Sequence, residues 1–301
     1  MKTLLQQIAC LCLFAALPFV NGCRGASAGA APVTPPSPCQ IALATHAGDL
    51  AIDNDIRRLQ ENVQTSRAGG RVNATVTGRL EQLGWKYVDK ARQSYDAGYY
   101  RLAEQCALCL TSLAKAPASE QIIREAGQQS MLLRGHVLHS LHRFPEAETL
   151  ARELTTRRGL HFDHGLLGDV LLEQGKLDEA GAAYQRMMEL KPGPQAYSRA
   201  AHLFWLRGDL TQARRLMRMA ATSAPGNGEA AAWMLTRYAQ LEWQGGNQPG
   251  AENALRDALA LTRDYAPALL LQARIRLAAG KPGAAIDALR LAAKQNPLPE
   301  Y

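Results

Sequence analysis

Residues 161–192 read HFDHGLLGDVLLEQGKLDEAGAAYQRMMELKP, and this stretch indicates the fold of the chain. Gly175 separates two helical segments, because glycine takes the left-handed backbone angles that end a helix at low cost. Gly168 in the first segment and Ala180 in the second are small, so the two helices can approach each other closely. Pro192 then ends the second helix, since proline cannot continue one. The stretch therefore predicts a helix–turn–helix unit.

The same unit recurs along the chain with a period close to 34 residues. Alanines at the position of Ala180 follow one another at spacings of 44, 33, 33, 38 and 34 residues. A glycine stands five residues before five of the six alanines, and His142 takes that place before Ala147. A fixed period of this length is the signature of a stacked helical-repeat protein. The six pairs are Gly98/Ala103, His142/Ala147, Gly175/Ala180, Gly208/Ala213, Gly246/Ala251 and Gly280/Ala285.

Each repeat is numbered from the residue nineteen positions before its alanine, which puts the six starts near residues 84, 128, 161, 194, 232 and 266. Proline follows three of the alanines after twelve residues, as Pro192, Pro225 and Pro297. A small residue also recurs at the eighth position of every repeat, where it is expected to face the alanine of the second helix. These small residues are Ala91, Gly135, Gly168, Ala201, Ala239 and Ala273.

From about Gly84 to the last residue, the chain resembles the tetratricopeptide repeat family. The third repeat carries the resemblance through Leu167-Gly168, Leu171, Tyr184 and Pro192, together with its alanine. The resemblance implies an all-α fold in which about six helix–turn–helix repeats stack into a right-handed α-α superhelix over residues 84–301. It also implies a non-enzymatic protein that binds a protein or peptide partner in a concave groove, as a scaffold or assembly factor.

In this family the second, fifth, ninth, twelfth and thirteenth positions of each repeat line the groove. All four tryptophans of the chain fall at second or twelfth positions. Aromatic rings with a few cations suit an extended peptide or a partner helix with apolar anchors, and they could also stack on sugar rings. The alternative is that several of these rings only brace neighbouring repeats. The predicted groove residues are Trp85, Arg92, Tyr95, His136, His139, Phe162, Asp169, His202, Trp205, Trp233, Gln240, Trp243 and Arg274.

Residues 1–22 are typical of an export signal, with Lys2 followed by an apolar stretch that is too short and broken for a membrane span. Val20-Asn21-Gly22-Cys23 resembles the lipobox of bacterial lipoproteins, which implies that Cys23 is lipidated and anchors the protein to a membrane. With Arg24 after the cysteine, the resemblance implies the outer membrane of a Gram-negative cell. Cleavage within residues 26–30 is the alternative, and it gives a soluble exported protein.

Two further segments precede the repeats. Residues 23–48 are rich in Ala, Pro, Ser and Gly and almost uncharged, which predicts a tether that holds the repeats away from the membrane. Residues 49–83 begin with an apolar stripe at helical spacing and are expected to form a helical cap on the first repeat. Cys39 in the tether is left as an odd thiol, which either pairs between molecules or stays free.

A cluster of cysteines and histidines provides an alternative function. Cys106 and Cys109 share one helix, and His136 and His139 lie on the next, with His164 further along. Imidazoles three residues apart share a helix face and can hold zinc or copper together with thiolates, so an envelope metal-binding protein is the second hypothesis. Cysteines at such positions are also common as small buried apolar residues.

Charge and motifs argue against other functions. The formal net charge is +7, yet no run of Lys or Arg marks a nucleic-acid surface. The sequence contains no nucleophile elbow, Walker loop, dinucleotide fingerprint or H-E-x-x-H motif, so it predicts no enzyme and no cofactor. The final helix, with Ile286 and Leu289, has no following helix in the sequence to cover it. This predicts that a partner or a second copy of the chain packs there, and the alternative is that the chain is a shortened relative of longer family members.

Overall fold

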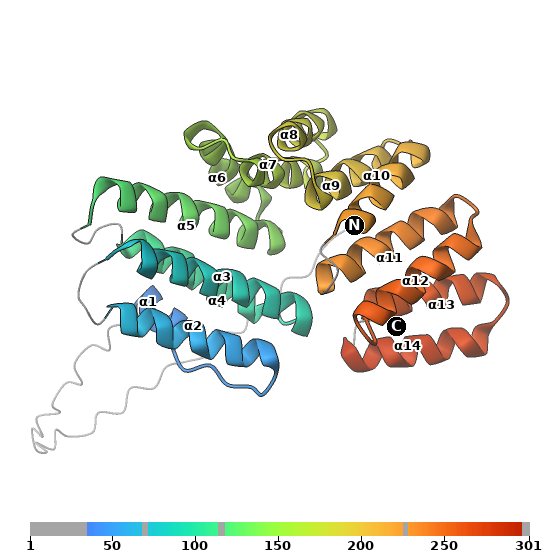
Figure 1. Ribbon diagram of the computed structural model, residues 1–301, viewed down its shortest axis with the longest axis horizontal. Helices are drawn as coiled ribbons and strands as arrows, with labels where there is room; N and C mark the ends of the chain where they lie inside the picture. Colours follow the sequence, from blue (N-terminus) through green and yellow to red (C-terminus); the bar gives the residue numbers. More distant parts are fainter. Residues whose placement is uncertain (1–34, 68–71, 114–117, 225–227, 297–301) are drawn as a thin grey trace, which may run out of the picture. The chain divides into compact units, whose positions relative to one another are not determined.

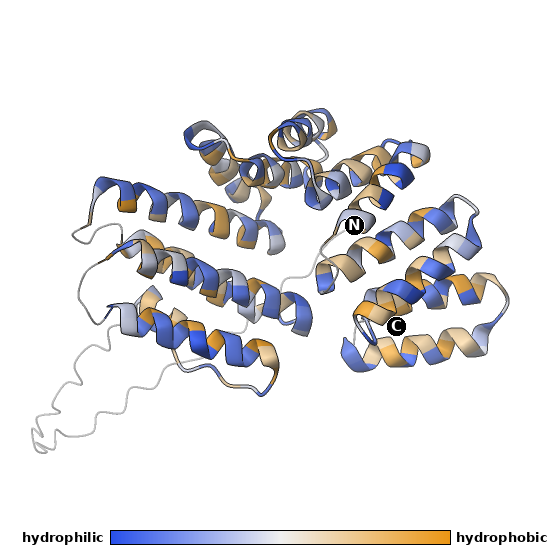
Figure 2. Ribbon diagram, in the orientation of Figure 1, coloured by the Kyte–Doolittle hydropathy of each residue, from blue (hydrophilic) through white to orange (hydrophobic). Residues whose placement is uncertain are grey.

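The computed structural model describes residues 35–67, 72–113, 118–224 and 228–296, and these residues form fourteen helices and no strand. Six consecutive helix pairs, from α3–α4 to α13–α14, each fold back on themselves and pack on the next pair (Figure 1). Apolar and polar residues are mixed along every helix (Figure 2), as expected for helices that each bury one stripe. The all-α solenoid prediction is confirmed. The helices are α1 Pro38–Ala42, α2 Ala51–Arg67, α3 Ala74–Ser94, α4 Gly98–Leu113, α5 Glu120–Ser140, α6 Phe144–Arg157, α7 His161–Glu173, α8 Leu177–Leu190, α9 Pro194–Leu206, α10 Leu210–Ser223, α11 Glu229–Gln244, α12 Gln248–Leu261, α13 Ala266–Ala278 and α14 Pro282–Gln295.

The small residues lie where the helices of a pair touch. Ala103, Ala147 and Ala180, like the other three alanines of the series, are buried. A Cβ atom at Gly168 would lie 2.3 Å from Cε1 of Tyr184, so a larger residue cannot enter without moving that ring. Close helix packing therefore selects small residues at these positions.

The turn inside most pairs is made by a residue with positive φ. Gly175 has φ 74°, and the equivalent glycines of the three following repeats have φ between 70° and 81°. His142 adopts φ 58° in the same place, which explains how it substitutes for glycine. The first repeat differs, because Tyr95 takes the left-handed conformation at φ 56° and Gly98 is already the first residue of α4. The turn role expected for Gly98 by analogy is therefore wrong.

The first two repeats have longer first helices than the frame predicted. Helices α3 and α5 are 21 residues each and begin at Ala74 and Glu120, ahead of the expected starts at residues 84 and 128. The first ten residues of α3 thus belong to the segment predicted as a cap, and α2 is the helix that packs on α3 from outside the repeats. Pro225 and Pro297 lie outside the described residues.

The predicted tether is wrong in its last part. Helix α1 lies within it, and Cys39 of α1 forms a disulfide with Cys109 of α4. Cys39 and Ala42 are buried against α4, so residues 38–42 belong to the folded domain. Cys39 is therefore neither free nor paired between molecules. Residues 23–34 of the predicted tether, like the export signal and Cys23, lie outside the described residues.

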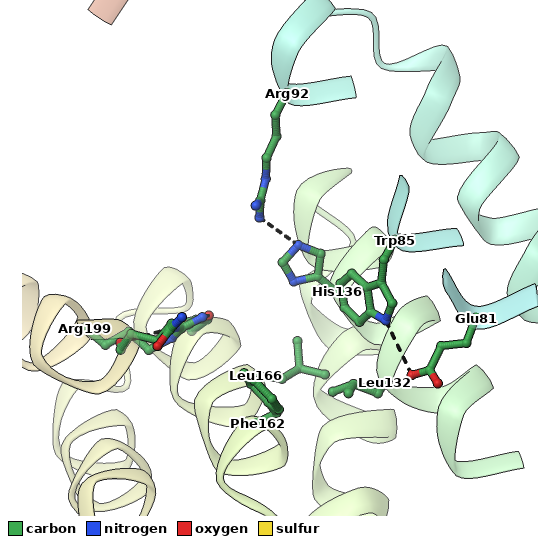
Figure 3. Close-up of a pocket in the computed structure, with 10 residues that line it drawn as sticks. Glu81, Trp85, Arg92, Leu132, His136, Phe162, Leu166 and Arg199 are labelled. Atoms are coloured by element: carbon green, nitrogen blue, oxygen red, sulfur yellow. Dashed lines mark hydrogen bonds and ion pairs between the residues drawn. The ribbon is translucent and has the colours of Figure 1, made fainter. Parts of the chain in front are cut away.

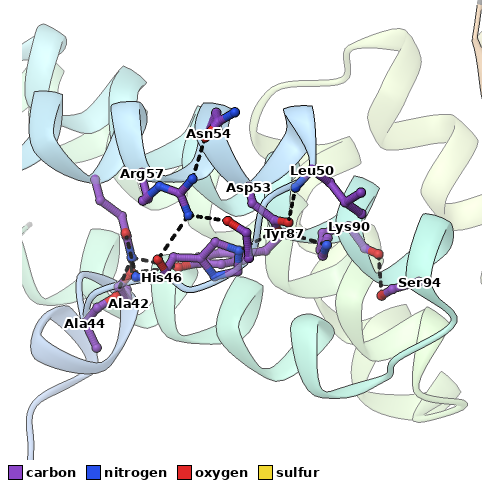
Figure 4. A network of polar contacts seen from close by, with 12 residues as sticks. Ala42, Ala44, His46, Leu50, Asp53, Asn54, Arg57, Tyr87, Lys90 and Ser94 are labelled. Carbon is purple, nitrogen blue, oxygen red and sulfur yellow. Dashed lines mark hydrogen bonds and ion pairs between the residues drawn. The ribbon is translucent and has the colours of Figure 1, made fainter.

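A buried polar network also ties this N-terminal segment to α2 and α3 (Figure 4). The Asp53 carboxylate on α2 accepts a hydrogen bond from His46 Nε2 at 2.7 Å and pairs with Lys90 Nζ of α3 at 2.9 Å. Burial alone would raise the pKa of Asp53, but the hydrogen bonds from His46 and Lys90 outweigh it and lower the pKa to about 2. Gln60 Nε2 donates to the Ala44 carbonyl at 2.6 Å, which fixes the chain before α2.

Candidate functional site

A pocket of about 360 Å³ opens over the first helices of repeats one to four, α3, α5, α7 and α9 (Figure 3). We call it the Trp85 pocket. Its walls combine apolar side chains with several charged groups, and they come from four different helices. A repeat solenoid can build such a site only because equivalent positions of successive first helices face the same way. The lining residues are Glu81, Trp85, Arg92, Leu132, His136, Phe162, Leu166, Asp169, Gln195 and Arg199.

The floor of the pocket is apolar. Leu132 and Leu166 are buried, Trp85 is half-buried, and Phe162 at the start of α7 is 48% exposed. An aromatic ring exposed to that extent beside buried leucines offers contact area that a ligand can remove from water. The floor therefore suits a large apolar side chain.

Arg92 and His136 form the upper side of the pocket as Figure 3 shows it, where Arg92 reaches from α3 to the imidazole on α5. The distance from Arg92 Nη2 to His136 Nε2 is 3.0 Å. Burial, and then the neighbouring Arg92 charge, lower the pKa of His136 to about 3, so the imidazole is neutral at pH 7 and accepts the hydrogen bond. The ring of His136 also packs against Trp85, with centroids 5.3 Å apart. The hydrogen-bond partner of Arg92 in the pocket is therefore a neutral group and not a carboxylate.

Asp169 and Arg199 form a side wall of the pocket and neutralise each other. Arg199 Nε and Nη2 donate to the two Asp169 carboxylate oxygens at 2.8 and 2.7 Å, and Tyr184 donates to the same carboxylate at 3.0 Å. Burial favours the neutral acid, but the Arg199 charge outweighs burial and holds the pKa of Asp169 below its usual value. The pair links α7 to α9 and leaves no net charge on this wall.

Glu81 lies at the end of the pocket next to Trp85. Its Oε1 accepts a hydrogen bond from Trp85 Nε1 at 3.4 Å, and no ion pair with it is found in the part of the chain that the structure describes. Burial raises the pKa of Glu81. The Trp85 hydrogen bond and the more distant charge of Arg158 favour the ionised carboxylate, but they do not outweigh the effect of burial.

Five of the predicted groove residues come together in this pocket: Trp85, Arg92, His136, Phe162 and Asp169. Two other lining residues occupy groove positions of their repeats but were not singled out, namely Gln195 at a second position and Leu132 at a fifth.

The remaining residues that line the pocket do not stand at the predicted groove positions of a repeat. Leu166 and Arg199 both stand at the sixth position of a repeat. Glu81 precedes the first repeat start, and it reaches the pocket because α3 begins at Ala74.

A second cluster joins α9 to α11. The ring of Trp205 stacks on His202 with centroids 5.5 Å apart, and the Arg237 guanidinium lies 5.8 Å from the Trp205 ring centroid. Trp205 Nε1 donates to Gln244 Oε1 at 2.8 Å, and Arg237 also donates to Gln240. The backbones of α9 and α11 approach each other less closely than those of the other successive first helices. These side chains bridge the wider gap, which favours a bracing role for Trp205.

The other predicted groove residues lie outside the Trp85 pocket. Trp243 packs half-buried against the core of repeat five, whereas Trp233 is 38% exposed. The Nε2 atom of His139 is buried, and it has no hydrogen-bond partner among the residues that the structure describes. Arg274 is exposed on α13, and Tyr95 ends α3. The binding role of these residues stays a prediction.

The alternative metal site is wrong in its ligand set. Cys109 forms the disulfide with Cys39 of α1, so its sulfur is not available as a thiolate ligand. Cys106 is buried, and burial raises the pKa of its thiol. His136 and His139 lie on α5 and His164 on α7. No group of three or more His, Cys, Asp or Glu within the described ranges is placed to hold one metal ion.

Within the same described ranges, no helix combines the length and the apolar character that a membrane crossing needs.

Comparison with known proteins identifies the repeats. Residues 132–193 and 166–228 match the family model described as "Tetratricopeptide repeat". A search of curated proteins finds no significant match. A chain in the crystal structure of the APC/C hetero-tetramer Cut9–Hcn1 is similar at 14% identity and a TM-score of 0.55, over 82% of this chain and 50% of the matched chain.

A tetratricopeptide repeat protein from Parabacteroides merdae ATCC 43184 is similar at 14% identity and a TM-score of 0.53, over 81% of this chain and 88% of the other. At this level of identity the similarities show the fold, which is a tetratricopeptide-type helical solenoid.

Proposed function

We propose that this chain, whose residues 132–228 match tetratricopeptide repeats, is a non-enzymatic scaffold or assembly factor that binds an extended segment of a partner protein in the Trp85 pocket. The fold itself supports protein–protein interaction, because a repeat solenoid offers a long surface of first helices. The observation that carries the proposal is the pocket: an exposed aromatic ring, a buried apolar floor and an arginine without an acidic partner converge there from four helices.

The dimensions of the pocket favour an extended segment over a helix. A helix with its side chains is about 10–12 Å wide, whereas a pocket of about 360 Å³ is at the small end of ligand sites and holds only the side chains of a short segment. The Asp169–Arg199 pair and the Trp85–His136 contact fix the walls before a ligand arrives. Such preorganisation reduces the entropic cost of binding.

We further propose that the protein is exported and lipid-anchored through Cys23, in the outer membrane if the cell is Gram-negative. The sequence of residues 1–23 supports this, and the Cys39–Cys109 disulfide adds independent support because disulfides persist in oxidising compartments. Only eleven residues separate Cys23 from Pro35, and an extended chain of that length spans about 40 Å at most. The repeat domain would therefore work close to the membrane surface.

Site-specific photo-crosslinking in cells tests the binding site. A photoreactive amino acid replaces Phe162 in the pocket, and in a matched control it replaces Leu261 on the second helix α12, which is 37% exposed and lies outside the pocket. We expect a discrete crosslinked partner from position 162 that is missing from position 261. The same crosslinks from both positions, or none from position 162, would contradict the proposal.

The lipid anchor has its own test. Labelling cells with radioactive palmitate should mark the wild-type protein, and the label should vanish in Cys23→Ser. An unlabelled wild-type protein would refute the anchor while leaving the binding site untouched.

A further inference from the structure

The two ends of the Trp85 pocket carry opposite charges that the protein leaves without opposite-charge partners. Glu81 and Arg92 both project from α3 and lie eleven residues apart. Glu81 is hydrogen-bonded only by Trp85, and Arg92 only by the neutral His136. Neither forms an ion pair with any residue that the structure describes.

The other two charged side chains that line the pocket, Asp169 and Arg199, pair with each other. Asp169 is held by Arg199 through both carboxylate oxygens. Arg158 acts on Glu81 only from a distance, because its guanidinium donates to Asp163 at 3.0 Å. The pocket therefore presents one acid at one end and one base at the other, with apolar side chains between them.

Helix geometry sets the spacing of the backbone positions that carry these groups. Eleven residues of α3 correspond to about 16 Å along the helix axis at 1.5 Å per residue. Along the same axis, the Cα atom of Trp85 lies about 6 Å from that of Glu81 and about 10 Å from that of Arg92. An extended ligand rises about 3.3 Å per residue, so these distances correspond to about two and about three residues of ligand.

We propose that the Trp85 pocket recognises a charge-ordered segment of its partner: a large apolar side chain, a basic residue about two positions to one side that meets Glu81, and an acidic residue about three positions to the other side that meets Arg92. This specificity rests on the proposed function of the pocket. The physical reason is charge complementarity: Glu81 is half-buried and loses part of its contact with water, and Arg92 is exposed and attracts an acidic group from solvent.

Synthetic peptides of eight residues test the order of charges. Four of them carry charged residues two positions before and three positions after the central residue. The central residue is phenylalanine in the Lys/Asp, Lys/Lys and Asp/Asp versions and alanine in a second Lys/Asp version. The fifth peptide is the phenylalanine Lys/Asp version with its residue order reversed. Binding to the full chain is measured by fluorescence anisotropy. We expect one of the two mixed-charge peptides to bind about fivefold more tightly than either like-charge peptide, as for partly exposed ion pairs, and the alanine peptide to bind more weakly still.

Charge-reversal variants of the protein should switch the preference rather than abolish binding. Arg92→Glu leaves two acids and should prefer the Lys/Lys peptide, whereas Glu81→Lys leaves two bases and should prefer the Asp/Asp peptide. Arg101→Glu on α4 makes the same change of net charge outside the pocket and should keep the wild-type preference. Because each variant gains a ligand, loss of folding cannot imitate the result.

Three outcomes would overturn the inference: no probe peptide binds the wild-type chain, the peptides bind without regard to charge order, or Arg101→Glu switches preference as Arg92→Glu does. If position 162 still crosslinks a discrete partner in any of these cases, the proposed function stands and the charge-ordered specificity alone is refuted.

Discussion

Reducing the Cys39–Cys109 disulfide is expected to loosen the first repeat selectively. The bond joins residues 70 positions apart and encloses α2 and α3 in the loop that it closes. In the chain-entropy model, a cross-link that closes a loop of this size stabilises the folded state by about 4 kcal/mol. Since 1.4 kcal/mol corresponds to a factor of ten, opening of the enclosed helices should become more frequent by up to about a thousandfold.

The effect should stay local, because each repeat of a solenoid contacts only its neighbours. Hydrogen–deuterium exchange followed by mass spectrometry, with and without reductant, measures this opening helix by helix. We expect faster exchange in α2 and α3 after reduction and unchanged exchange from α7 to α14. The buried polar network around Asp53 still holds the segment, so the increase should fall below the full entropic value.

Two variants control the experiment. Cys39→Ala/Cys109→Ala should exchange like the reduced wild type and should not respond to reductant. Cys106→Ala changes a buried free cysteine on the same helix, and it should respond to reductant as the wild type does. Equal exchange in oxidised and reduced protein, or an increase spread evenly over all repeats, would refute the stapling role of the disulfide.

Three further predictions concern stability and assembly. The pKa of Asp53 is lowered from 3.8 to about 2, so its ionised carboxylate contributes about 2 kcal/mol to the free energy of unfolding above pH 4. This contribution is lost as the pH falls toward 2, and the acid unfolding curve of Asp53→Asn should lack this loss. Gly168→Ala should lower the free energy of unfolding in urea by about 1–3 kcal/mol, because the new Cβ overlaps the ring of Tyr184. Gly127→Ala is the control, because the space around its Cβ is open, and it should not destabilise the protein; equal effects of the two substitutions would contradict the packing account. Ile286 and Leu291 are exposed on α14, so the wild-type protein should self-associate through them and show a mass that rises with concentration in analytical ultracentrifugation. The rise should disappear in Ile286→Glu/Leu291→Glu, and a wild-type monomer at all concentrations would refute self-association there.

The repeat frame could be predicted from the sequence because its cause is steric and local. Close contact between two helices admits only small residues, and a left-handed turn favours glycine, so both recur at fixed spacing. The first helices of repeats three, four and six begin at the predicted residues His161, Pro194 and Ala266. Helices α3 and α5 begin earlier than predicted, because counting back a fixed nineteen residues from the alanine ignores helical turns added at the start.

The N-terminal segment could not be predicted in the same way. Its Ala/Pro/Ser composition is typical of a tether, yet one cysteine and one histidine anchor it to helices far along the chain. Pairing of Cys39 with Cys109 depends on the three-dimensional approach of α1 to α4, which spacing alone does not reveal. For the same reason the sixth-position Arg199 was missed: its place in the pocket depends on the carboxylate it meets on α7.

The central claim is that the Trp85 pocket binds a segment of the partner protein. Isothermal titration calorimetry of the segment crosslinked at position 162, titrated into the wild type, Phe162→Asp and Leu261→Asp, tests this claim most directly. Burying an aromatic anchor against the exposed Phe162 ring contributes about 1.4 kcal/mol or more, so Phe162→Asp should weaken binding at least about tenfold and Leu261→Asp should not change it. Equal affinity for all three proteins would contradict the account.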